Sequence, residues 1–172
     1  MNTMQYGFTL PELLVTVLVL AIISFMAIPF YHNTQAKQEA QLLPMKLQMH
    51  LQQAKQSAVL YHNNMVICSS TDKENCSDNA WSTGLMIFAD LNQNRSREDN
   101  EPIIDSHLFQ LRYGSLRWQG SLRSTTIVFQ GDTGLPRGSI GSFYYCSQYD
   151  VPHRKIILNM MGIVRHETPS SC

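Results

Sequence analysis

The hydrophobic and polar positions divide the chain into three stretches with different periods. The first is an uncharged apolar run from Leu13 to Phe30, interrupted only by Thr16, Ser24 and Pro29. About 18 to 20 apolar residues in a helix span the hydrocarbon core of a bilayer. The run therefore predicts a membrane-spanning helix near the N-terminus.

The second stretch continues this helix with a single apolar face. Its apolar positions recur at steps of three and four residues, at Ala36, Ala40, Leu43, Leu47, Leu51, Ala54 and Ala58. Such spacing is typical of an amphipathic helix. We expect one helix from about Thr9 to Leu60. It should bend rather than break at Pro44, where an interior proline costs about 3 kcal/mol and kinks a helix.

After Asn64 the pattern changes to short β-rich runs separated by Gly, Asn, Asp and Ser. These runs are Met65–Cys68, Gly84–Ala89, Ile103–Gln110, Ser124–Gln130, Ser142–Ser147 and Arg154–Met160. Residues around Val164 alternate as in one more short strand at the end of the chain. Because no helical pattern separates the runs, we expect an antiparallel sheet with the second half of the helix on one face. The predicted fold class is α+β, a long N-terminal helix packed on an antiparallel β-sheet head.

Composition excludes a disordered chain and shows an uneven distribution of charge. The 172 residues are 44% hydrophobic, and 13 basic residues balance 13 acidic ones. A neutral chain argues against a nucleic-acid footprint over the whole protein. Within the head, however, residues 72–105 carry a net charge of −5 and residues 112–166 carry +5. Opposed charges of this kind suit head-to-tail contacts between subunits.

Two interpretations of the N-terminus compete. A cleaved secretory signal has a basic start and a small-residue cleavage site after its apolar core. Residues 1–7 contain no Lys or Arg, and the apolar run ends at Ile28-Pro29-Phe30, which is a poor cleavage site. The other interpretation places the cut before the run, between Gly7 and Phe8, and keeps the apolar helix in the mature protein.

The residues around this junction, Gly7-Phe8-Thr9-Leu10-Pro11-Glu12-Leu13-Leu14, resemble the signal of type IV prepilins. The resemblance implies cleavage after Gly7 by a prepilin peptidase and N-methylation of Phe8. It also implies that Glu12 offsets the amino terminus of a neighbouring subunit during assembly. A capping box with Thr9 as N-cap and Pro11 in the first turn gives Glu12 a second role, and both roles can hold at once.

The head resembles the GspH/FimT group of minor pilins and pseudopilins. The matching segments are Val66–Ser70 followed by Cys76, Trp81–Asp90, Gly141–Phe143, Arg154–Leu158 and Gly162–Arg165. The resemblance implies a structural subunit with other pilins or pseudopilins as partners. It implies a single-pass protein of the bacterial inner membrane with its head in the periplasm. The expected segments are a leader (1–7), an apolar transmembrane and assembly half-helix (8–35), an amphipathic half-helix (36–64) and a β-rich head (65–172).

The leading hypothesis is a minor type IV pilin of the FimU/FimT kind in a pilus tip or priming complex. The first alternative is a GspH-like minor pseudopilin of type II secretion, and the second is a DNA-uptake minor pilin. Some FimT-like pilins bind DNA through Gly-Arg-x-Arg near the C-terminus. Here the match is Gly162-Ile163-Val164-Arg165, so Arg165 is the one retained arginine and the motif argues against DNA as a partner.

Four cysteines, Cys68, Cys76, Cys146 and Cys172, are expected to be paired in an exported head. Three connectivities are possible. The short separation of the first two favours Cys68–Cys76 as a local loop, which leaves Cys146–Cys172 to hold the C-terminal tail.

Catalytic and cofactor motifs are not found, and we expect neither an enzyme nor a cofactor. The segment from Asp90 to Glu101 partly matches a calcium loop. Its candidate ligands Asp90, Asn92, Asn94 and Glu101 occupy positions 1, 3, 5 and 12 of such a loop, but Arg95 stands where glycine is usual. The alternative is a polar hairpin turn, in which Asp and Asn favour tight backbone geometry.

Overall fold

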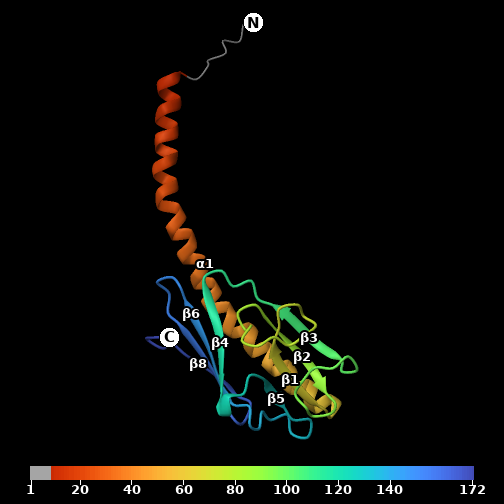
Figure 1. Ribbon diagram of the computed structural model, residues 1–172. Helices are drawn as coiled ribbons and strands as arrows, with labels where there is room; N and C mark the ends of the chain where they lie inside the picture. Colours follow the sequence, from red (N-terminus) through yellow and green to blue (C-terminus); the bar gives the residue numbers. More distant parts are fainter. Residues whose placement is uncertain (1–8) are drawn as a thin grey trace.

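One long helix lies against a head of two antiparallel sheets in this computed structural model, which describes residues 9–172 (Figure 1). The elements in chain order are α1 (Leu10–Tyr61), β1 (Asn64–Ser69), β2 (Gly84–Asp90), β3 (Ile103–Leu108), β4 (Gly114–Gly120), a 3₁₀ turn (Ser121–Arg123), β5 (Ile127–Phe129), β6 (Gly141–Ser147), β7 (Arg154–Leu158) and β8 (Val164–Glu167). The α+β class with a long N-terminal helix is confirmed.

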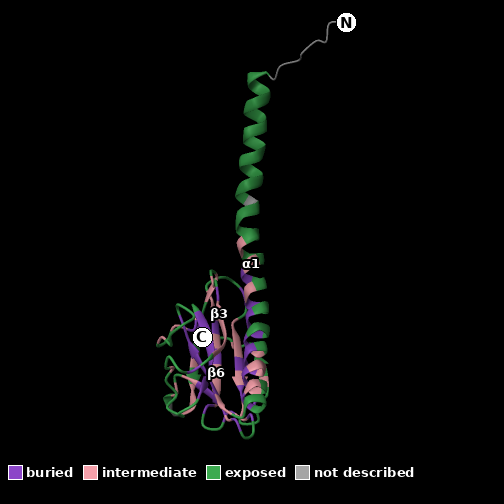
Figure 2. Ribbon diagram, turned by 90° about the vertical axis from the view of Figure 1, so that its right-hand side faces the viewer, coloured by how far each residue is buried: buried purple, intermediate pink, exposed green. Residues whose placement is uncertain are grey.

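Helix α1 agrees with the predicted helix to within one residue at each end. It stops where His62 adopts a left-handed backbone conformation with φ of 52°, which cannot continue a helix. Pro29 and Pro44 both lie inside it, and the helix runs through both without a break. Figure 2 shows that its first half stands free of the head, whereas its second half carries buried residues along one side.

The buried side of α1 is the predicted apolar face. All seven of its predicted positions are at most 3% exposed, and the first of them in the chain is Ala36. Small alanine side chains, including those of Ala36 and Ala58, occupy both ends of this face. Leu43, Leu47 and Leu51 fill the wider space between them, and burial of each leucine contributes about 1.5 to 3 kcal/mol.

The strands form two four-stranded sheets, in the orders β3-β2-β1-β5 and β4-β6-β7-β8. All strand pairs are antiparallel, as predicted. The expectation of one sheet is wrong, because strand order depends on contacts between distant segments. Strand β4 was also missed, since only Leu116 and Trp118 are apolar in its seven residues.

Strand β1 is buried on both faces, which explains its unbroken apolar sequence. Met65 and Ile67 belong to the main core beneath α1. Val66 and Cys68 point the other way and pack with Phe88 of β2 in a second, smaller core. The sheet of β1 and β2 is therefore the central layer of the head, with the helix on one side.

Aromatic rings join the loop before β2 to the second sheet. Trp81 contacts Phe143 of β6 with ring centroids 5.1 Å apart, and Trp118 of β4 lies 4.6 Å from the same ring. The Trp118 indole N–H donates to the Ser124 carbonyl at 3.0 Å, so its polar atom is satisfied. These contacts fix the two sheets relative to each other beneath the helix.

Candidate assembly site

The predicted cleavage site, Gly7 and Phe8, lies outside the described residues. The structure does describe Glu12, which is exposed in the first turn of α1. The predicted hydrogen bonds of the capping box are absent there: Thr9 is the N-cap residue, but its side chain makes no capping bond. Its hydroxyl instead donates a long hydrogen bond to Glu12 Oε2 at 3.5 Å. Thr9 as N-cap and Pro11 in the first turn are therefore confirmed, but the hydrogen bonds of the capping box are not, and the long bond from Thr9 is the one side-chain contact found for the Glu12 carboxylate among the described residues.

The helix that follows Glu12 exposes its apolar side chains. Within the described residues, α1 is the one helix long and apolar enough by length and composition to cross a membrane. Its best 18-residue window has a mean hydropathy of 2.7, and none of that window is buried. Exposed apolar surface of this extent marks contact with lipid or with other proteins.

Glu39 attaches the second half of α1 to the head. Its Oε1 accepts hydrogen bonds from the Tyr145 hydroxyl at 2.8 Å and from the Tyr113 backbone N–H at 3.2 Å. Its Oε2 accepts one from the Arg112 backbone N–H at 2.9 Å. Burial and the contact with Glu39 raise the pKa of Tyr145, so its hydroxyl stays a donor. The ring of Tyr145 also lies over Gly114, where a Cβ atom would come within 2.5 Å of it.

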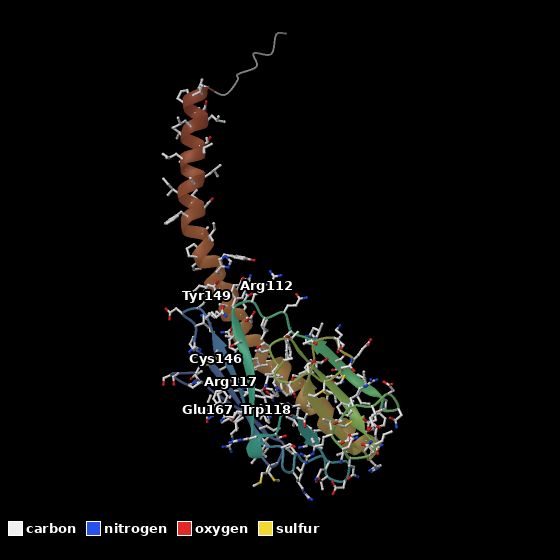
Figure 3. The ribbon with its side chains drawn as sticks, in the orientation of Figure 1. Arg112, Arg117, Trp118, Cys146, Tyr149 and Glu167 are labelled. Carbon is white, nitrogen blue, oxygen red and sulfur yellow. A yellow bond between two sulfur atoms is a disulfide. The ribbon has the colours of Figure 1, made fainter. Side chains whose placement is uncertain are left out.

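Both favoured disulfides are present. Cys68–Cys76 closes the loop after β1, and Cys146–Cys172 joins β6 to the last residue of the chain. Arg117 on β4 makes a second contact with the tail, because its Nη2 donates a hydrogen bond to the Cys172 carbonyl at 3.2 Å. The C-terminal tail is thereby fixed beside the sheet of β4 and β6, where Figure 3 places Arg117 and Cys146.

The second sheet carries a row of charged and aromatic side chains across four strands. Arg117, Tyr144, Lys155 and Glu167 occupy one cross-strand register. Arg117 and Lys155 lie 5.1 and 5.8 Å from the centroid of the Tyr144 ring, as in cation–π contacts, and Lys155 pairs with Glu167 at 3.3 Å. Arg165 is exposed on β8 opposite Ile157, outside this row.

The candidate calcium ligands come together in the loop between β2 and β3, but most of their oxygens bind backbone N–H groups. Asp90 accepts from Asn94 and Arg95 at 3.1 and 3.0 Å. Glu101 accepts from Leu91 and Glu98 at 2.9 and 3.1 Å, and both carboxylates are 2% exposed.

Asn92 and Asn94, the other two candidates, donate through their side-chain amides to Glu98 Oε1 at 3.1 and 2.8 Å. Arg95 has φ of 63°, the left-handed backbone that glycine usually supplies at this position. No group of three or more His, Cys, Asp or Glu side chains in the described part of the chain is placed to hold a metal ion. Calcium stays a candidate ligand of these four residues and is not the expected occupant of the loop.

A histidine cluster between α1 and β3 has no signal in the sequence. His50 Nδ1 lies 2.9 Å from Asp105 Oδ2, and the ring of His50 lies 5.3 Å from that of His107. Burial and the neighbouring His50 lower the pKa of His107. His50 is 55 or more positions away from Asp105 and His107, so no local pattern indicates its contact with them.

The two charged segments of the head lie for the most part in different sheets. The acidic segment, residues 72–105, contains β2 and the first half of β3. The basic segment, residues 112–166, contains β4, β6 and β7 of the second sheet and also β5 of the first. Strands β2 and β3 lie on the opposite side of the head from β4 and β6 (Figure 1).

Comparison with known families agrees with this architecture. The family described as type II transport protein GspH matches residues 45–162, and the prokaryotic N-terminal methylation motif matches residues 2–28. The chain therefore belongs to the GspH family of minor pilins and pseudopilins. The resemblance that the prepilin signal and the head segments indicated is confirmed.

Solved structures share the fold. The type IV minor pilin FimU of Pseudomonas aeruginosa is 21% identical, with a TM-score of 0.58 over 79% of this chain and 96% of that chain. The minor pseudopilin EpsH of the type 2 secretion system of Vibrio cholerae is 10% identical, with a TM-score of 0.52 over 77% of this chain and 99% of that chain. No curated protein sequence gives a significant match.

Proposed function

We propose that the chain is a minor type IV pilin, a structural subunit of the tip or priming complex of a pilus. In this proposal a prepilin peptidase cleaves after Gly7 and Phe8 becomes N-methylated. The apolar half of α1 holds the subunit in the inner membrane, with the head in the periplasm, and later packs with the helices of other pilins.

The observation that carries the proposal is the state of Glu12. This carboxylate is exposed at the start of an apolar helix, and no capping bond occupies Thr9 beside it. A carboxylate next to a membrane segment is costly and marks a functional contact. The methylated amino terminus of a neighbouring subunit would supply the opposite charge.

Substitution of Glu12 by Ala tests this role. The variant should be exported and membrane-bound, because the apolar helix suffices for insertion, but it should be depleted from sheared filaments or from the isolated minor-pilin complex. Thr9→Ala is the matched control, since it removes the neighbouring hydroxyl and leaves the carboxylate. Normal incorporation of Glu12→Ala would refute the assembly role.

The second candidate function is that of a pseudopilin in type II secretion, and it is supported by the name of the matching family, type II transport protein GspH. As a pseudopilin the chain would use the same helix and head in a secretion filament. Deletion of the gene separates the two roles: loss of surface pili supports the pilus, and loss of exoprotein secretion with pili retained supports the secretion system.

DNA uptake has weaker support. Arg165 is exposed, but position 163, where the motif has its other arginine, is Ile163. Each phosphate contact contributes a salt slope of about 0.9, so one arginine leaves little affinity at physiological salt. A mobility shift in the submicromolar range that Arg165→Ala abolishes would favour the DNA-uptake role instead.

A further inference from the structure

Aromatic side chains gather where α1 leaves the head. The ring of Tyr149, in the loop between β6 and β7, stacks on His32 with centroids 6.3 Å apart. It also meets Tyr113 edge-on at 5.4 Å, and Tyr113 lies 6.0 Å from His32. Figure 3 shows Tyr149 and Arg112 at the end of the head nearest the free half of the helix. Tyr149 is 40% exposed, and Tyr31 beside this cluster is 58% exposed.

The depth of this cluster follows from the helix geometry. The uncharged apolar run ends at Phe30, so His32 lies about 3 Å and Ala36 about 9 Å further along the axis at about 1.5 Å per residue. The headgroup region of a bilayer is about 5 to 8 Å thick on each side of the hydrocarbon core. When the apolar run fills that core, Tyr149 and Tyr113 therefore stand at the level of the headgroups, where tyrosine is enriched in membrane proteins.

A hollow of about 450 Å³ opens at the same level. Phe30, Asn33 and Lys37 line it from α1, and Asp150 and its two successors line it from the β6–β7 loop. Lys37 and Asp150 are exposed, and neither is in an ion pair with another described residue. The Lys37 ammonium is opposite in charge to a lipid phosphate, and the Asp150 carboxylate is opposite in charge to a lipid amine. A zwitterionic aminophospholipid carries both groups.

We propose that this neck surface, formed by Phe30, Lys37, Tyr113, Tyr149 and Asp150, binds the headgroup of a phospholipid in the bilayer that α1 crosses. Lys37 contacts the phosphate, Asp150 contacts the amine, and the tyrosine rings lie among the glycerol and headgroup atoms. The contact holds the head against the membrane before the subunit is incorporated into a filament. This inference rests on the proposed membrane insertion of the apolar helix.

Fluorescence quenching in nanodiscs of phosphatidylethanolamine tests the contact with the full chain. A fraction of the lipid carries a nitroxide on its headgroup, and Tyr149→Trp places an indole in the neck surface. The unsubstituted chain supplies the background from Trp81 and Trp118. Tyr61→Trp is the matched control, because Tyr61 is also exposed but lies about 45 Å further along the helix than Tyr31.

The indole in Tyr149→Trp should lose much more emission to the nitroxide than the indole in Tyr61→Trp. Lys37→Glu should reduce that loss, whereas Lys46→Glu, a charge-matched change elsewhere on α1, should not. Asp150→Asn should reduce the loss in phosphatidylethanolamine and leave it unchanged in phosphatidylglycerol, which has no amine. Equal quenching of the two indoles, or no effect of Lys37→Glu, would overturn the headgroup contact. Co-elution of the chain with the nanodisc reports insertion separately, so failure of insertion is distinguishable as a failure of the proposed function.

Discussion

The hydroxyl of Tyr145 donates a 2.8 Å hydrogen bond to Glu39, and this bond links the middle of the second sheet to the helix 106 residues earlier in the chain. Two backbone N–H groups, from Arg112 and Tyr113, share the same carboxylate. One side chain of α1 thus receives three donors from the head. The angle at which the head stands on its helix depends on this carboxylate as well as on the apolar face.

Removal of the carboxylate should therefore destabilise the head. Glu39→Ala leaves three donors without their acceptor and should lower the free energy of unfolding by about 2 kcal/mol, whereas Tyr145→Phe removes one bond and should cost about 1 kcal/mol. Urea unfolding of the detergent-solubilised chain, followed by tryptophan fluorescence, measures both. Gln38→Ala, at an exposed neighbour on α1, is the control. Equal effects of Glu39→Ala and Gln38→Ala would contradict the role given to Glu39.

Tyr145 should also make the protein sensitive to alkali. Burial and Glu39 raise the pKa of Tyr145 in the folded state, whereas the pKa in the unfolded chain is about 10. Above about pH 10 the unfolded state loses the proton first, so the folded state loses stability as pH rises toward the folded pKa. Melting temperatures from pH 9 upward should fall more steeply for the unsubstituted chain than for Tyr145→Phe. Parallel curves for the two proteins would contradict this expectation, and Tyr61→Phe controls for loss of an exposed hydroxyl.

His107 should cause the opposite response, a loss of stability in acid. Burial, His50 and Lys46 lower its pKa in that order, Asp105 opposes them with a smaller effect, and Lys73 lowers the pKa least. As pH falls below about 6.5 the unfolded state binds a proton that the folded state does not bind. Stability should therefore decrease as pH falls from 6.5 through the lower pKa of the folded state.

In His107→Gln the melting temperature should fall less between about pH 7.5 and pH 5 than in the unsubstituted chain. The exposed His62 gives a matched control, and His62→Gln should leave the pH dependence of the melting temperature unchanged. A pH dependence that is the same in His107→Gln and in the unsubstituted chain would show that other groups produce it.

The tail disulfide should stabilise the head more than the local one. Cys146–Cys172 spans 26 positions and Cys68–Cys76 spans 8. In the chain-entropy account, closing the longer loop contributes about 3.5 kcal/mol and closing the shorter one about 2.5 kcal/mol. Peptide mapping without reduction should recover these two linked pairs, and urea unfolding of the double variant Cys146→Ser, Cys172→Ser should show the larger loss. A peptide linking Cys76 to Cys146 would contradict the pairing.

Features with a local period were predictable from the sequence. The positions from Ala36 to Ala58 repeat at helical spacing, and all of them are buried. Six of the eight strands follow from runs of β-rich residues, and β8 follows from the alternation around Val164. The favoured cysteine pairing also holds, because one of its loops is short enough to be read along the chain.

Features that depend on distant contacts were not predictable. Glu39 lies among the polar residues of α1, and its partners are more than 70 positions away. His50 and Asp105 meet only because β3 lies along the edge of the first sheet beside the helix. The division of the strands between two sheets has the same cause. The capping box failed for a different reason: the residue types fit the motif, but Thr9 makes no capping bond.

The mature N-terminus tests the central claim most directly, since both the membrane helix and the assembly role of Glu12 depend on the processing of a prepilin. Intact-mass and peptide mass spectrometry of the protein extracted from membranes should give a chain that begins at Phe8 and carries one added methyl group on its amino nitrogen. A chain that begins near Tyr31, after removal of the apolar run, would contradict the account and make the N-terminus a secretory signal.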